Sequence, residues 1–154
     1  MDSRNTGISL IEIMVVIGLF TAIAGLSMLA SIDMYRAHLF RGDRDMLISV
    51  LQKARSRAMN NICLGSGCSD GKSHGVHFES GEYVIFQGTS YSAPDPLNER
   101  FSVNDNVVIS GLLNVVFSQL SGDAAPEGDI TIADDAGHTS VITINGEGQI
   151  LWTN

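Results

Sequence analysis

The stretch TGISLIEIMVVIGLFTAIAGLSMLASI (Thr6–Ile32) decides the fold, because it is apolar along almost its whole length. No residue from Ile13 to Ile32 is charged, and a helix needs roughly 20 apolar residues to cross the hydrocarbon core of a bilayer. Glu12 places one carboxylate near the start of this stretch. Because an unpaired carboxylate in apolar surroundings is costly, Glu12 is a candidate functional residue.

Two ordinary interpretations compete for this stretch. In a secretory signal peptide, Arg4 is the basic residue and Ala22-Ile23-Ala24 is the cleavage site. In a simple membrane anchor, Glu12 reaches out from the end of the helix. The apolar run continues past the cleavage site, which does not suit a signal peptide. Since Asp2 offsets Arg4, the flank lacks the positive charge that orients an anchor.

The same stretch resembles the prepilin motif of the type IV pilin superfamily. In that motif a short polar leader ends in glycine, and the mature helix carries glutamate at its fifth position. Here Gly7 matches the last leader residue, Ile8 the first mature residue and Glu12 the glutamate. The family most often begins its mature chain with phenylalanine, so Ile8 is a departure, although its amine stays available for methylation. The resemblance is specific over about the first thirty residues.

The resemblance implies how the N-terminus is processed and used. A prepilin peptidase cleaves after Gly7 and N-methylates the new terminus at Ile8. In a filament, Glu12 of one subunit then meets the Ile8 amine of its neighbour, because a paired charge in an apolar bundle is tolerated and fixes the register. Glu12 is thus an assembly residue and not a catalyst.

The resemblance also implies partners and a location. The partners are identical or related pilins in a filament, the prepilin peptidase, the inner or cytoplasmic membrane and its assembly platform. Before assembly the subunit lies in the cytoplasmic membrane as a single-pass protein, with its C-terminal domain outside the cytoplasm. After assembly it belongs to an extracellular or periplasmic filament.

Charge is distributed unevenly along the chain. Residues 33–57 hold six basic residues and three acidic ones, whereas residues 58–154 hold two basic residues and twelve acidic ones. Affinity for nucleic acid rests largely on lysine and arginine, so the acidic C-terminal region is a poor binder of polyanions. Its composition suits a soluble, exposed surface.

The two cysteines, Cys63 and Cys68, lie in the sequence NICLGSGCSDG. Small residues between them make ring closure easy, and outside the cytoplasm a disulfide is the expected state. Two alternatives stay open: a pair of free thiols, or a zinc site that adds His74 and His77. The spacing matches no zinc module, and a strand through HGVHF places these histidines on opposite faces. We therefore expect a disulfide, no metal and no cofactor.

Periodicity predicts an α+β fold with a long N-terminal helix. In RDMLISVLQKARSRAMNN, apolar residues recur every three or four positions, which indicates an amphipathic helix. The segments GVHF and YVIFQG, separated by ESGE, indicate a hairpin, and further short strands follow. We expect a leader at 1–7, a transmembrane or filament-core helix at 8–32, its amphipathic continuation at 33–61 and a globular β domain at 62–154. The amphipathic half then packs on an antiparallel sheet, as in pilins.

The helix and the late hairpin extend the resemblance. The spacing LQ.AR..A and a terminal G.I strand look like the H-type minor pseudopilins of type II secretion and the FimT-type minor pilins. This chain has the helix residues Leu51, Gln52, Ala54, Arg55 and Ala58, followed by Gly148 and Ile150. The major-pilin alternative stays open, since all these proteins share the N-terminal motif.

These features predict a structural subunit, a pilin or minor pseudopilin of a type IV pilus or of a type II secretion-like filament. The alternative is a minor pilin that acts as a DNA receptor in natural transformation, for which Lys53, Arg55 and Arg57 are the only support. A solvated helix flank explains these three cations more simply. An enzyme is not expected, because the four histidines are scattered and no serine or cysteine has a recognisable nucleophile setting.

Two further groups of residues invite interpretation. Asp129, Asp134 and Asp135 suggest a calcium loop at 129–138, but they lack an ordered ligand spacing, so a solvated turn is the simpler reading. Tyr91 in a proline-containing loop is a candidate partner contact. Four other aromatic residues are expected in the β core: Phe78, Phe86, Phe117 and Trp152.

Overall fold

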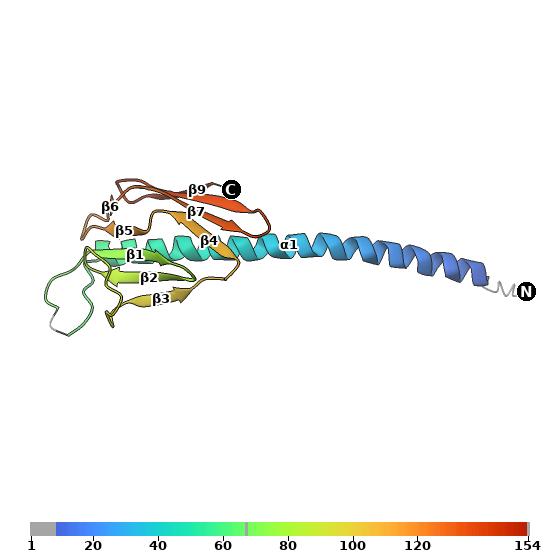
Figure 1. Cartoon of the computed structure of the whole chain (residues 1–154), viewed down its shortest axis with the longest axis horizontal. Coiled ribbons are helices and arrows are strands. Elements are labelled where there is room, and N and C mark those ends of the chain that lie inside the picture. Colours follow the sequence, from blue (N-terminus) through green and yellow to red (C-terminus); the bar gives the residue numbers. More distant parts are fainter. Residues whose placement is uncertain (1–8, 67, 154) are drawn as a thin grey trace, which may run out of the picture. The chain divides into compact units, whose positions relative to one another are not determined.

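The computed structural model describes residues 9–66 and 68–153, without the side chains of residues 27–31. One helix, α1 (Leu10–Met59), precedes all the strands (Figure 1). The strands are β1 (His74–Glu79), β2 (Glu82–Gln87), β3 (Glu99–Ser102), β4 (Val107–Gly111), β5 (Asn114–Phe117), β6 (Ala124–Ala125), β7 (Gly128–Asp134), β8 (Thr139–Ile144) and β9 (Ile150–Thr153). By packing, the chain divides into two compact units, Met1–His38 and Leu39–Asn154.

The strands of the second unit form two antiparallel sheets. The five-stranded sheet has the order β3-β2-β1-β5-β6, and the four-stranded sheet has the order β4-β7-β8-β9. The predicted hairpin is confirmed, because β1 pairs with β2 in antiparallel register through a short turn at residues 80–81. The chain passes from one sheet to the other between β4 and β5, over two residues only.

The core of the second unit lies between the last turns of α1 and both sheets. Leu47, Leu51, Ala54 and Ala58 are fully buried along one stripe of the helix, which confirms the predicted apolar face. Isoleucines of β7 and β8 and aromatic residues of β1, β2 and β5 belong to the same cluster. Burial of this stripe stabilises the packing of the helix against the sheets.

The structure corrects two parts of the predicted fold, although the α+β class holds. In residues 9–66 and 68–153, no helix has the combination of length and apolarity that crossing a membrane requires, so the predicted membrane-spanning half of the helix is wrong. The predicted single antiparallel sheet is also wrong, because the strands form two sheets. Residues of both sheets and of the helix contribute to one core, so each sheet buries its apolar face.

Arg55 joins the helix to a turn at the end of each sheet. Its Nε donates to the carbonyl of Gly122, between β5 and β6, at 3.3 Å. Its Nη2 donates to the carbonyl of Glu147, between β8 and β9, at 2.9 Å. The two turns also touch each other, since a Cβ added at Gly148 would clash with the carbonyl oxygen of Gly122. The arginine and the glycine of the pattern LQ.AR…G.I therefore lie at one junction.

Candidate functional site

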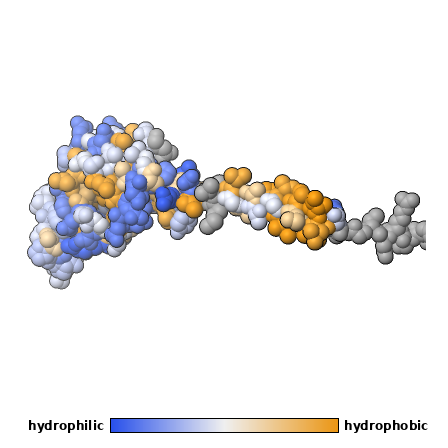
Figure 2. Space-filling model, turned by 45° about the vertical axis from the view of Figure 1, so that its right-hand side comes forward, coloured by the Kyte–Doolittle hydropathy of each residue, from blue (hydrophilic) through white to orange (hydrophobic). Residues whose placement is uncertain are grey.

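The N-terminal part of α1 exposes an apolar surface on every side. The large apolar side chains of residues 10–26 are between 44% and 79% exposed. They lie at positions 10, 11, 13–17, 19, 20, 23 and 26, so at 3.6 residues per turn they surround the helix rather than line one face. In Figure 2, hydrophobic residues gather on the visible face of this part of the helix, most densely toward its N-terminal end. A surface of this size and composition marks a site that another apolar surface covers.

Glu12 is the charged residue of this apolar surface. It lies in the first turn of α1, where its backbone N–H donates to the carbonyl of Ser9 at 3.0 Å. A carboxylate at this position interacts favourably with the positive end of the helix dipole. Among the described residues, Glu12 has no ion-pair partner, and its side chain is exposed.

The two other predicted processing residues, Gly7 and Ile8, lie outside the described residues. Cleavage after Gly7 and methylation at Ile8 stay predictions. Glu12 is the part of the motif that the structure places.

The cysteines lie in the loop that follows α1. The Cα atoms of Cys63 and Cys68 are 5.8 Å apart, which is a normal distance for a disulfide. The histidines of the zinc alternative have other partners. His74 is buried, and its Nδ1 lies 3.1 Å from the carbonyl of Lys72, whereas His77 stacks on Tyr91. In the described part of the chain, no three His, Cys, Asp or Glu side chains are arranged to hold a metal.

The basic residues of the amphipathic helix bind groups within the chain. Lys53 and Arg57 both form ion pairs with Glu99 on β3, while Arg55 donates to the two turns described above. The hydrogen bond from Lys53, with help from Arg57, lowers the pKa of Glu99 below its ordinary value, although partial burial opposes the shift. Lys53 also lies 5.1 Å above the ring of Phe101. These cations are therefore already paired.

In the predicted calcium loop at 129–138, residues 129–134 instead belong to β7, and residues 135–138 connect this strand to β8. Asp134 accepts hydrogen bonds from the backbone N–H of His138 at 2.8 Å and from its ring Nδ1 at 2.7 Å. Burial acts to raise the pKa of Asp134, but the hydrogen bonds from His138 outweigh it and lower that pKa. Asp129 accepts instead from the hydroxyl of Thr143 at 2.7 Å. Residues 135–138 thus form a hydrogen-bonded turn that closes the β7–β8 hairpin.

The aromatic residues fall into two groups. Phe78, Phe86 and Phe117 are buried, as predicted. Trp152 was expected in the core but is 48% exposed, because it lies on β9 at the free edge of the four-stranded sheet. Tyr91, the candidate partner contact, packs with its ring centroid 4.0 Å from that of His77.

Sequence reasoning missed one group of functional candidates, the exposed cations near the middle of α1. Arg36 and Arg41 are exposed, and neither has an ion-pair partner in the described part of the chain. The excess of basic residues between Asp33 and Arg57 indicates that exposed cations lie in this segment. The sequence does not indicate which of these cations form ion pairs within the chain. That distinction depends on where β3 and the turns lie.

Comparison of the chain with protein-family models, with curated proteins and with solved structures finds no match.

Proposed function

We propose that this protein is a structural subunit of a pilin-type filament, which associates with other copies or with related subunits through the N-terminal part of α1. The observation that carries the proposal is the exposed apolar surface of residues 10–26, interrupted by the single carboxylate of Glu12. The prepilin-like motif from Gly7 to Glu12 supports the same function. Neither feature calls for catalysis, and we propose no enzymatic activity.

Helix association explains the apolar surface in energetic terms. Burying one large apolar side chain contributes about 1.5–3 kcal/mol, so even partial burial of several such side chains drives association strongly. A bundle of like helices covers all sides of each helix, which fits a surface that has no polar face. Related subunits that share the same apolar pattern fit the bundle equally well.

Glu12 gives such a bundle a defined register. Within a bundle its carboxylate needs a cation, because an unpaired buried charge costs several kcal/mol. Cleavage after Gly7 supplies that cation as the amine of Ile8, at the start of the neighbouring helix. A single charged pair in an apolar interface selects one alignment of the helices over others.

The C-terminal domain fits an exposed position in the filament. Its acidic composition favours solubility, and cysteines at disulfide distance suit a compartment outside the cytoplasm. The DNA-receptor alternative loses its support, because Lys53, Arg55 and Arg57 are engaged with Glu99 and with two backbone carbonyls. We therefore favour a structural role over a nucleic-acid receptor.

The intact mass and the N-terminal sequence of the protein, purified from the organism that makes it, test this function. We expect a chain that begins at Ile8 with one N-methyl group. A chain that begins after Ala24 indicates an exported domain and overturns the proposal, and so does an uncleaved Met1 in assembled material. The result does not depend on any property of the C-terminal domain.

The role of Glu12 has a separate test. We expect Glu12→Gln to weaken self-association, in detergent, of the processed chain that begins at Ile8, as measured by sedimentation equilibrium. Asp33→Asn, which removes a second exposed carboxylate of the same helix, is the matched control. Equal effects of the two substitutions would show that Glu12 has no special place in assembly.

A further inference from the structure

The four-stranded sheet has two free edges, and the strand at each edge carries no charged residue. Among the described residues, β9 pairs only with β8, and β4 pairs only with β7. An uncharged, exposed edge strand is a template for pairing with a further strand. The groups that surround the two edges differ, and this difference decides which kind of segment each edge can accept.

The register of β9 determines which of its backbone groups point outward. In an antiparallel pair, alternate residues direct both their N–H and C=O groups toward the partner strand. Gln149 faces β8, because its carbonyl accepts from the N–H of Asn145 at 3.2 Å, and Leu151, two residues later, faces β8 as well. The N–H and C=O groups of Ile150 and Trp152 therefore point to the free edge. They have no hydrogen-bond partner in the part of the chain that the structure describes.

A groove of about 680 Å³ lies beside this edge, between the end of α1 and the start of β9. Ile150 and Leu151 both line it, although their side chains point to opposite faces of the sheet, so the groove lies at the edge itself. Met59 lines the side of the helix and is 45% exposed, while Leu151 is 57% exposed. All these residues belong to the unit Leu39–Asn154. A strand added to β9 thus gains backbone hydrogen bonds on one side and apolar contacts on the other.

The charged residue that lines this groove is Arg55. Its Nε and Nη2 donate to the backbone carbonyls of Gly122 and Glu147, which are neutral. Among the described residues, no carboxylate forms an ion pair with Arg55, and its Nη1 has no acceptor. The carboxylate of Glu147 accepts instead from Gln149, at 3.3 Å. Because guanidinium groups bind carboxylates strongly, Arg55 favours a bound segment that carries one.

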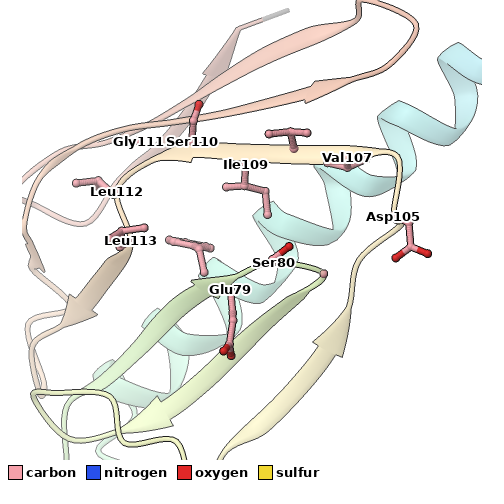
Figure 3. Close-up of a pocket in the computed structure, with 12 residues that line it drawn as sticks. Glu79, Ser80, Asp105, Val107, Ile109, Ser110, Gly111, Leu112 and Leu113 are labelled. Carbon is pink, nitrogen blue, oxygen red and sulfur yellow. The ribbon is translucent and has the colours of Figure 1, made fainter.

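The edge at β4 offers no such cation. A cavity of about 300 Å³ separates β4 from the β1–β2 hairpin (Figure 3). The described residues that line it include Glu79 and Asp105 but no lysine, arginine or histidine. Figure 3 shows the side chains of Glu79 and Asp105 turned away from β4. A segment with a carboxylate therefore finds a cation beside β9 and none in the lining of the cavity beside β4.

We infer that the groove beside β9 binds an extended segment of another protein, which adds a strand to the four-stranded sheet and places a carboxylate beside Arg55. All strand pairs of the described residues are antiparallel, so we expect the segment to run antiparallel to β9, with its carboxylate at the C-terminal end. Its apolar side chains alternate, because a residue opposite Ile150 shares the core-facing side of the sheet with it. The net negative charge of the chain is screened beyond about 8 Å at physiological salt, so the nearby guanidinium dominates.

Isothermal titration calorimetry of the full chain in a nonionic detergent tests the inference with synthetic peptides. The probe is acetyl-Val-Thr-Val-Thr-Glu-amide, and the control peptide carries Gln in place of Glu. We expect the control peptide to bind about threefold more weakly, because it lacks the carboxylate. Equal affinities of the two peptides would overturn the role of Arg55.

Backbone N-methylation of the probe tests the strand pairing itself. N-methylation of either Val removes a donor to β9, and we expect it to weaken binding about fivefold or more. N-methylation of the Thr between them changes an N–H that points away from β9, so we expect less than about a twofold effect. Equal effects of methylation at Val and at Thr would show that the peptide does not bind as a strand.

Two variants of the chain and its single tryptophan locate the bound peptide. Met59→Glu places a carboxylate in the groove, and we expect it to weaken binding of the probe about fivefold or more. Leu113→Glu is the matched control, with less than about a twofold effect, because Leu113 is 69% exposed and lines the cavity beside β4. Thermal unfolding verifies that both variants fold. Trp152 is the only tryptophan, so a shift of its emission to shorter wavelength reports that this edge is covered.

The outcomes separate this inference from the proposed function. Weaker binding to the Leu113→Glu variant, with native affinity for the Met59→Glu variant and unchanged emission of Trp152, would place the peptide at β4 and overturn the inference. A probe that does not bind the native chain overturns it as well. Because the groove involves no residue of the N-terminal part of α1, either result leaves the proposed filament function standing.

Discussion

Replacement of Gly148 by alanine tests whether the junction of two turns and the helix stabilises the domain. Gly148 has a φ of +71°, in the left-handed region that costs a residue with a side chain about 1 kcal/mol or more. A Cβ at this position also meets the carbonyl oxygen of Gly122, so one of the two turns must move. Movement of either turn lengthens a hydrogen bond from Arg55, which is bonded to both.

The expected loss of stability is the sum of the backbone strain at position 148 and the weakening of one hydrogen bond from Arg55. A hydrogen bond from a charged group contributes about 1.5–3 kcal/mol, which we reduce to about 1 kcal/mol because the Arg55 side chain is partly exposed. With the backbone strain, Gly148→Ala loses about 2–3 kcal/mol of unfolding free energy. For a chain of this size that loss lowers the midpoint of thermal unfolding by about 5–10 °C.

Gly137 provides the matched control for this substitution. It also lies between two strands of the four-stranded sheet and has a φ of +89°, but a Cβ added there meets no atom within 4 Å. Gly137→Ala therefore measures the backbone strain alone, about 1 kcal/mol or 2–4 °C. The assay is thermal unfolding of the full chain, followed by far-ultraviolet circular dichroism. Equal midpoints for the two variants would refute the idea that the turns support each other through Arg55.

Three more predictions concern the core, the ion pairs and the cysteines. Leu51→Ala removes a fully buried side chain from the face of α1, and we expect a loss of about 2–5 kcal/mol in denaturant unfolding. The hydrogen bond from Lys53 lowers the pKa of Glu99 in the folded state, so its stabilisation is present above the ordinary value of 4.5 and is lost as the pH falls below it. Glu99→Gln should flatten the dependence of the unfolding midpoint on pH in this acid range, and an unchanged dependence would contradict the assignment. Alkylation without prior reduction should leave Cys63 and Cys68 unmodified, whereas a mass increase from two alkyl groups would show free thiols.

The local sequence predicts correctly how the C-terminal half of α1 is buried. It does not predict the N-terminal half correctly. The repeat of apolar residues from Leu47 to Ala58 predicts a buried stripe, and the structure confirms it. Periodicity is sufficient there because burial of a helix face leaves its mark every three or four residues. In the N-terminal half, residues are apolar on all sides, and sequence alone led to a membrane-spanning helix that the described residues do not support.

The strands show the same division. The hairpin of β1 and β2 was predictable, because both strands and their turn are contiguous in sequence and pair with each other. The separation into two sheets was not predictable, because β4 and β5 are neighbours in sequence that belong to different sheets. Which strands pair across the sheet is decided by how the whole set covers the helix, and no local pattern records that choice.

The candidate site divides along similar lines. The sequence by itself determined the apolar N-terminal stretch, the position of Glu12 within it and the amphipathic face of the helix, because hydropathy and spacing are local properties. Only the tertiary structure decided that Lys53, Arg55 and Arg57 bind acceptors within the chain, since these acceptors lie more than forty residues away along the sequence. It also created the cavity between β4 and the β1–β2 hairpin, whose walls come from segments that meet only when two sheets pack on one helix.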